Sequence, residues 1–148
     1  VVLSAGFSEA GEAGRELNDR LLAAVKASGV RIVGPNCLGL MNLDADFRLG
    51  FGGTLQLKTL KPGPIAMVTQ SGGFGFGVVA VACYHGLGFN HVISTGNEAD
   101  LTALDWMEHL IERDDVEILT AFLEGTTEGK RLRRLGARAL ELGKPVLI

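Results

Sequence analysis

The chain of 148 residues has few cysteines and no apolar run of membrane-spanning length. Its two cysteines, Cys37 and Cys83, form neither a disulfide framework nor a metal-ligand spacing, so we predict no metal site. Their scarcity fits the reducing cytoplasm, where we place the protein, and no secretory signal is evident. The net charge is −3 and charged residues make up 21% of the chain. We therefore expect neither a nucleic-acid surface nor a membrane surface.

Several catalytic and nucleotide-binding motifs are also missing. The chain has no zinc-binding pair, no Walker lysine motif and no G-x-S-x-G nucleophile turn. The glycines from Gly72 to Gly75 do not follow the G-x-G-x-x-G spacing, which disfavours an NAD site. The three histidines lie away from the glycine-rich turns and are interpreted as surface or packing residues: His85, His91 and His109.

What is present is an alternation of apolar strand patterns and helices, in a chain that is 47% hydrophobic. We expect strands at residues 1–5, 30–33, 65–68, 91–94, 116–123 and 145–148, and helices at residues 9–27, 72–85, 101–112 and 128–142. Residues 40–60 are interpreted as a hairpin or irregular crossing, and residues 61–64 as a linker. Repeated strand–helix units predict the α/β class, with parallel sheets and right-handed crossovers. Because both ends of the sequence fall inside strand patterns, we expect a fragment.

The most informative turn follows the apolar run at residues 65–68. Ser71, Gly72 and Gly73 come between that run and a glycine-dotted apolar helix. A strand that enters a helix through such a turn directs several backbone N–H groups to one point, where the helix dipole favours an anion. Glycine lacks Cβ, which gives a phosphate room to approach. The alternative is a tight turn between a strand and a helix with no ligand.

Other polar residues also follow predicted strands, and ligands bind at the carboxyl ends of parallel strands. The side chain of Asn36 offers donors and an acceptor to a polar ligand, and Cys37 is suited to line a narrow slot for a thiol. The alternative is a structural turn that contains a buried cysteine. A nucleophilic Cys37 is not expected, because no nearby His or Lys would lower its pKa. Glu124 is suited to orient an imidazole, and the alternative is a carboxylate at a helix N-terminus.

Five motifs in a fixed order make the sequence recognisable. They are Ser4-Ala5-Gly6-Phe7-Ser8-Glu9, Gly34-Pro35-Asn36-Cys37-Leu38-Gly39, Thr69-Gln70-Ser71-Gly72-Gly73, Ser94-Thr95-Gly96-Asn97-Glu98-Ala99-Asp100 and Phe122-Leu123-Glu124-Gly125. The series resembles the nucleoside-diphosphate-forming acyl-CoA synthetases, the superfamily of succinyl-CoA synthetase. The resemblance covers nearly the whole chain.

The resemblance implies a reaction and two domains. The family joins a carboxylic acid to CoA with ATP or GTP, through an acyl phosphate and a phosphorylated histidine. Residues 1–61 would be the C-terminal part of a CoA-binding Rossmann-like domain. Residues 62–148 would be a flavodoxin-like domain truncated at its C-terminal end. The phosphorylated histidine and the ATP-grasp domain or subunit, which would hold the nucleotide with Mg²⁺, are absent from the chain, so we expect the fragment alone to be inactive.

The resemblance also implies roles for single residues. Those that would lie along CoA are Ser4, Gly6, Phe7, Asn36 and Cys37. Those that would surround the phosphate of the phosphohistidine are Ser71, Gly72 and Gly73. Glu124 matches the carboxylate that holds the histidine.

Two other functions stay open from the sequence. The same domains occur fused to acetyltransferase domains, where they would sense a ligand and catalyse no ligation. A flavodoxin-like phosphate-binding domain unrelated to CoA is the second alternative. The sequence does not determine which carboxylic acid or which nucleotide is used. It is compatible with a homo-oligomer.

Overall fold

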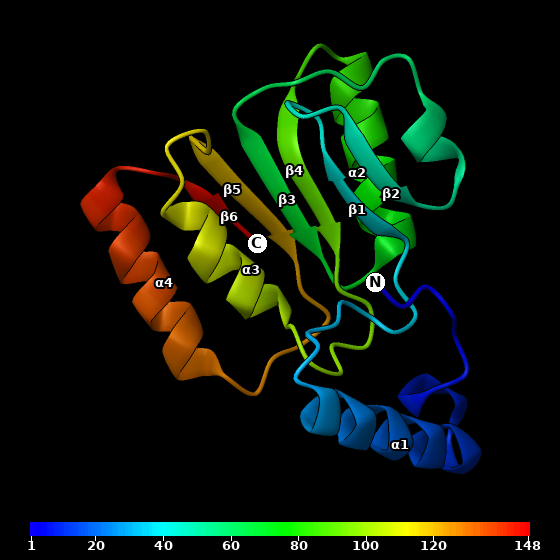
Figure 1. Cartoon of the computed structure of the whole chain (residues 1–148). Coiled ribbons are helices and arrows are strands. Elements are labelled where there is room, and N and C mark those ends of the chain that lie inside the picture. Colours follow the sequence, from blue (N-terminus) through cyan, green and yellow to red (C-terminus); the bar gives the residue numbers. More distant parts are fainter.

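Four parallel strands form most of the sheet in the structure, a computed structural model that describes residues 1–148 (Figure 1). They are β3 (Ile65–Thr69), β4 (Phe89–Ser94), β5 (Ile118–Phe122) and β6 (Val146–Leu147). Two antiparallel strands, β1 (Gly39–Asn42) and β2 (Phe47–Gly50), extend the sheet beside β4. The strand order is β2-β1-β4-β3-β5-β6. The sheet is therefore mixed, and the predicted hairpin within residues 40–60 is its antiparallel edge.

Helices cover both faces of the sheet (Figure 1). On one face, α2 (Gly72–Tyr84) packs with the short helix Gly53–Gln56 against side chains such as Met67 and Val92. The other face carries α3 (Ala103–Ile111) and α4 (Gly129–Leu142), which pack over a second core. Every residue of β3 is buried, as expected for a central parallel strand covered on both sides.

The first helices lie apart from the sheet. After a short helix at Ser8–Ala10, α1 (Glu12–Ser28) buries only Gly14 and extends away from the strands in Figure 1. Its C-terminus follows the expected chemistry, because Gly29 adopts the left-handed conformation and its N–H donates to Val25 O. The chain then returns through residues 30–38 to the sheet.

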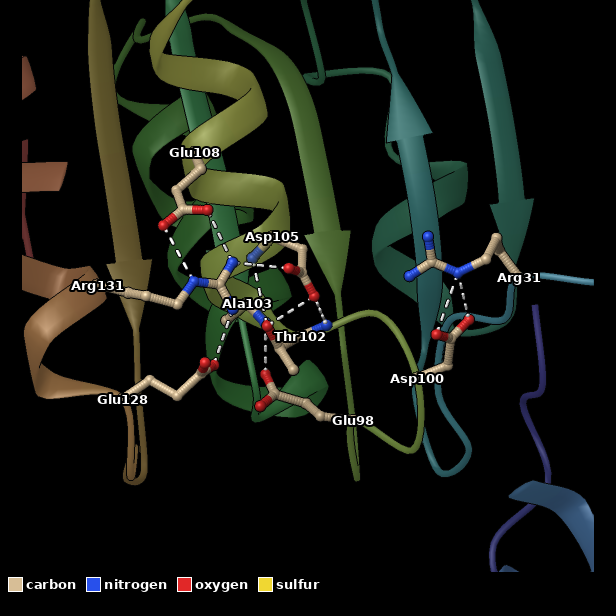
Figure 2. A network of polar contacts seen from close by, with 9 residues as sticks. All are labelled: Arg31, Glu98, Asp100, Thr102, Ala103, Asp105, Glu108, Glu128 and Arg131. Atoms are coloured by element: carbon tan, nitrogen blue, oxygen red, sulfur yellow. Dashed lines mark hydrogen bonds and ion pairs between the residues drawn. The ribbon is translucent and has the colours of Figure 1, made fainter. Parts of the chain in front are cut away.

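The expected strands at residues 1–5 and 30–33 are wrong. Only two backbone hydrogen bonds join residues 1–5 to residues 30–36, from Val2 N to Val33 O and from Asn36 N to Ser4 O. Pro35 has no N–H to continue the pairing. Residues 32–35 instead accept hydrogen bonds from residues 97–101, the loop that follows β4. Arg31 also pairs with Asp100 of that loop, at 3.0 Å (Figure 2).

The predicted boundary at residues 61 and 62 lies within a shared sheet. Strands β1 and β2 come from before this boundary, and the other four strands come from after it. Leu40 to Asn42 of β1 pair with Ile93 to His91 of β4. The boundary stays a prediction.

Arg131 joins α3 to α4 through a network of ion pairs (Figure 2). Its guanidinium lies 2.7 Å from Asp105 and from Glu108, and 2.9 Å from Glu128. The hydrogen bonds from Arg131 hold the pKa of Glu108 below its usual range. Because Glu108 is on α3 and Arg131 is on α4, the network fixes how these two helices lie on their face of the sheet.

We expect Arg131→Met to lower the free energy of unfolding by about 1–2 kcal/mol at pH 7, since the carboxylates lose their partner but stay partly solvated. The lowered pKa of Glu108 makes its contribution present above about pH 4.5, the ordinary pKa of the group, and lost as the pH falls through the lower folded-state pKa. The difference from wild type should therefore shrink between pH 7 and pH 3. Urea denaturation at several pH values measures it, with Arg133→Met as the control because Arg133 is exposed and forms no ion pair. A difference independent of pH would contradict this account.

Candidate functional site

The loops after three parallel strands meet at one edge of the sheet. β3 leads to α2 on one face, whereas β5 leads to α4 on the other, so the neighbouring strands β3 and β5 form the topological switch point of the sheet. Such a point is where open α/β sheets bind ligands. A cavity of about 280 Å³ lies there. Its lining residues are Asn36, Leu38, Gln70, Ser71, Gly72, Gly73, Gly96, Asn97 and Glu124.

The structure thus brings together residues of four of the five motifs. Asn36, Ser71 to Gly73 and Glu124, all predicted as site residues, line the same cavity. They come from the loop before β1, the β3–α2 turn and the end of β5. The expectation that these residues lie at one edge of the sheet is confirmed, whereas their roles stay predictions.

The N-terminus of α2 has unsatisfied backbone donors in this cavity. Ser71 precedes the first helical residue and makes no capping bond through its side chain. The first backbone bond of the turn runs from Gly75 N to Ser71 O, at 2.9 Å, and the N–H groups of Gly72 and Gly73 have no hydrogen-bond partner. These donors and the helix dipole make the turn suited to an anion.

The N-terminus of α3, nearby on the same edge, is different. Thr102 and Asp105 form a capping box there, and Ala103 N donates to Glu98 Oε1 at 2.7 Å (Figure 2). Thr102 N and Ala103 N donate to carboxylates of the chain, and Asp105 N donates to the Thr102 hydroxyl. The start of α3 thus uses most of its donors within the chain itself, whereas Gly72 and Gly73 of α2 keep theirs free.

The two glycines of the turn are needed for different reasons. A Cβ at Gly72 would lie 2.6 Å from Leu38 Cγ and 2.8 Å from Ser94 Oγ, so this glycine permits close packing. A Cβ at Gly73 would meet no protein atom within 4 Å. The expectation that both glycines leave room for a phosphate therefore fits Gly73, and at Gly72 the missing Cβ makes room for protein atoms.

Glu124 is exposed at the end of β5 and lines the same cavity. Its carboxylate has no hydrogen-bond or ion-pair partner in the chain. Helix α4 begins only at Gly129, and its N-cap residue is Glu128. Glu124 is therefore not the N-terminal carboxylate of that helix, and it stays available to a ligand.

The segments predicted to lie along CoA are tied to this cavity by polar contacts. Asn36 has a positive φ of 56°, and its side-chain amide donates to Asn97 Oδ1 at 3.1 Å. Asn97 in turn donates to Glu9, whose carboxylate accepts from the N–H groups of Gly6 and Phe7. Asn36 is thus the predicted CoA residue that reaches the cavity.

Ser4 is hydrogen-bonded to Asn36 and Cys37 follows Asn36 in the chain, but the two residues are in different environments. Ser4 is exposed, and its carbonyl accepts from Asn36 N at 2.9 Å. Cys37 is 2% exposed, with Sγ 3.4 Å from Val2 O, and it does not line the cavity. Burial raises the pKa of its thiol, in agreement with the expectation that Cys37 is no nucleophile.

Sequence reasoning missed Gln70 and Asn97 as site residues. Both also line a second cavity of about 500 Å³ on the α3 side of the switch point. The other residues around it are Glu98, Thr102, Ala103, Leu104, Leu123, Gly125, Thr126, Thr127 and Glu128. The available signal was their position: Gln70 is a polar residue directly after β3, and Asn97 is a polar residue in the loop that follows β4.

None of the helices is long and apolar enough to span a membrane. No three His, Cys, Asp or Glu side chains are grouped so that they would hold a metal ion.

Comparison with known proteins identifies the class. Residues 62–148 match the family model described as the succinyl-CoA ligase like flavodoxin domain, and the chain belongs to this family. It is 35% identical over 148 residues to the ADP-forming acetate–CoA ligase I of Archaeoglobus fulgidus, covering 100% of this chain and 21% of that protein. It is also 35% identical to the alpha subunit of ADP-forming acetate–CoA ligase II of Pyrococcus furiosus, covering 99% of this chain and 31% of that subunit.

A solved structure shows the same fold. The dinucleotide-forming acetyl-coenzyme A synthetase 1 of Ca. Korarchaeum cryptofilum, in complex with phosphate and ADP, aligns with a TM-score of 0.83 and 28% identity, covering 99% of this chain and 31% of that one. The chain therefore spans about a fifth to a third of the length of these relatives. Its resemblance to acyl-CoA synthetases that form a nucleoside diphosphate is confirmed.

Proposed function

We propose that the chain is part of an ADP-forming acid–CoA ligase, which makes an acyl-CoA from a carboxylic acid, CoA and ATP. The observation that carries this proposal is the cavity between Gly73 and Glu124, where free N–H groups at the start of α2 face the same space as a free carboxylate. A phosphorylated imidazole needs both groups: donors for its phosphoryl oxygens and an acceptor for its ring N–H. The two relatives from Archaeoglobus fulgidus and Pyrococcus furiosus are named as ligases of this kind.

In this proposal the residues of the cavity act on the phosphoryl group as it passes to the carboxylate of the acid. The N–H groups of Gly72 and Gly73 stabilise its negative charge, with the dipole of α2 behind them. Glu124 accepts a hydrogen bond from the imidazole, so that the other ring nitrogen carries the phosphoryl group toward Gly73. The acyl phosphate that results is then open to attack by the thiol of CoA, which releases phosphate.

CoA is proposed to approach along Ser4, Gly6, Phe7 and Asn36. The chain fits this at Asn36, which is exposed and lines the cavity beside Gly72. Gly6 N and Phe7 N already donate to Glu9, so their contribution would be the shape of the loop. Cys37, being buried, would support Asn36 by packing beneath it.

The remaining partners are proposed from the family. ATP with Mg²⁺ would be held by an ATP-grasp domain or subunit outside these residues. The substrate is a carboxylic acid of unspecified structure. We also propose that the protein is located in the cytoplasm.

We expect Gly73→Ala, in the full-length protein that contains this chain, to slow acyl-CoA formation at least tenfold and to weaken binding of inorganic phosphate. The added methyl meets no protein atom, so the melting temperature should stay the same or rise. Activity is measured as ADP released from ATP in the presence of CoA and a panel of acids, and phosphate binding by calorimetry.

The matched control is Gly77→Ala, one turn later in α2, where an added Cβ also meets nothing within 4 Å. It should leave both measurements unchanged. Wild-type protein without ADP release for any acid would overturn the ligase proposal. Normal phosphate affinity in Gly73→Ala would show that phosphate does not bind at this turn.

A further inference from the structure

Gln70 is the residue at which β3 and β5 separate. Its backbone N–H donates to Phe122 O at 3.0 Å and so extends the parallel pairing one residue beyond the strands. After Gln70 the chain enters α2 on one face, whereas the chain after Phe122 turns toward α4 on the other. No backbone hydrogen bond joins the two segments beyond this point.

The side chain of Gln70 replaces the missing backbone contacts. Its Oε1 accepts from Glu124 N at 2.6 Å and from Gly125 N at 3.2 Å. Its Nε2 donates to Gly125 O at 3.0 Å. Three hydrogen bonds from one amide thus fix two consecutive residues, and they require a side chain that both donates and accepts.

The position of the Glu124 carboxylate depends on this backbone. The carboxylate has no partner of its own in the chain, so only the backbone of Glu124 keeps this side chain at the cavity that it shares with Gly73. Gln70 lines both cavities at the switch point, whereas Glu124 lines only the smaller one, with Gly73. The amide of Gln70 supplies the hydrogen bonds of Glu124 N, Gly125 N and Gly125 O.

We propose that Gln70 is a positioning residue: its amide holds the Glu124–Gly125 peptide so that the carboxylate of Glu124 faces the Ser71–Gly73 turn. The effect on phosphotransfer rests on the function proposed above, whereas the effect on the peptide does not. Misplacing a catalytic group by about 1 Å costs on the order of a hundredfold in rate, so losing its support should slow phosphotransfer tenfold or more.

The test is Gln70→Met in the full-length protein, because Met has a similar length and no amide. We expect hydrogen–deuterium exchange of the peptide containing Glu124 and Gly125 to accelerate at least tenfold. Formation of the phosphohistidine, followed by rapid quench, should slow at least tenfold, with an unchanged KM for CoA. Gln56→Met is the control, since Gln56 is exposed and lies in the short helix Gly53–Gln56, away from both cavities.

A double variant separates positioning from general damage. If Gln70 acts through Glu124, adding Gln70→Met to Glu124→Gln should cause no further loss of rate. A full additional tenfold loss would overturn the proposal, as would unchanged exchange of the Glu124–Gly125 peptide in Gln70→Met. Absence of phosphohistidine in wild type would instead refute the ligase function, and faster exchange in Gln70→Met would still support the role of its amide in holding the peptide.

Discussion

Replacing Glu124 with Gln should slow formation of the phosphohistidine about a hundredfold or more, the scale expected when a catalytic group is lost or misplaced. The substitution keeps the size of the side chain but weakens its ability to accept a hydrogen bond from an imidazole. Because Glu124 is exposed and its carboxylate has no partner, the melting temperature and the affinity for CoA should hardly change. Rapid quench of the full-length protein with ATP measures the rate.

Glu128→Gln is the matched control for this prediction. Glu128 follows Glu124 by four residues and is the N-cap of α4, and its carboxylate lies 2.9 Å from Arg131. Its loss should lower the melting temperature and leave phosphohistidine formation near the wild-type rate. Near-normal phosphorylation in Glu124→Gln would show that this carboxylate does not orient the imidazole.

The sequence was sufficient to predict the helices and strands that bury most apolar surface. The run Ile65–Val68 became β3, and the spacing of Leu104, Met107 and Leu110 gave the buried face of α3. In these two segments the spacing of the apolar residues fits only one kind of secondary structure. The segments at residues 1–5 and 30–33 also look apolar, yet residues 32–35 bond to the loop after β4 and form no strand. Local pattern alone does not specify that partner.

The candidate site was predictable in part for a related reason. Ser71, Asn36 and Glu124 follow apolar segments, and a parallel topology brings such residues to one edge. The role of Gln70 was not predictable, because its amide bonds to residues 54 and 55 positions away. Those bonds depend on which strand lies beside β3. The difference between Gly72 and Gly73 likewise depends on Leu38, which only the folded chain brings near.

Gly96 decides how closely residues 30–36 approach the loop after β4. It has a positive φ of 58°, and a Cβ there would lie 2.2 Å from Pro35 O and 2.6 Å from Asn36 O. The next residue, Asn97, donates its N–H to Pro35 O at 2.9 Å and accepts from the amide of Asn36. A side chain at Gly96 would force these two segments apart and separate Asn36 from the rest of the cavity.

We therefore expect Gly96→Ala to lower the free energy of unfolding by about 3 kcal/mol or more, because backbone strain and a clash with main-chain oxygens add together. Gly143→Ala is the control: Gly143 has a similar φ of 68°, but a Cβ there would meet nothing within 4 Å. Strain alone should cost this control about 1 kcal/mol. Urea denaturation of both variants measures the difference, and calorimetry with phosphate reports whether the cavity survives. Equal losses in the two variants would mean that the contact with Pro35 and Asn36 relaxes freely, and that Gly96 is needed only for its backbone conformation.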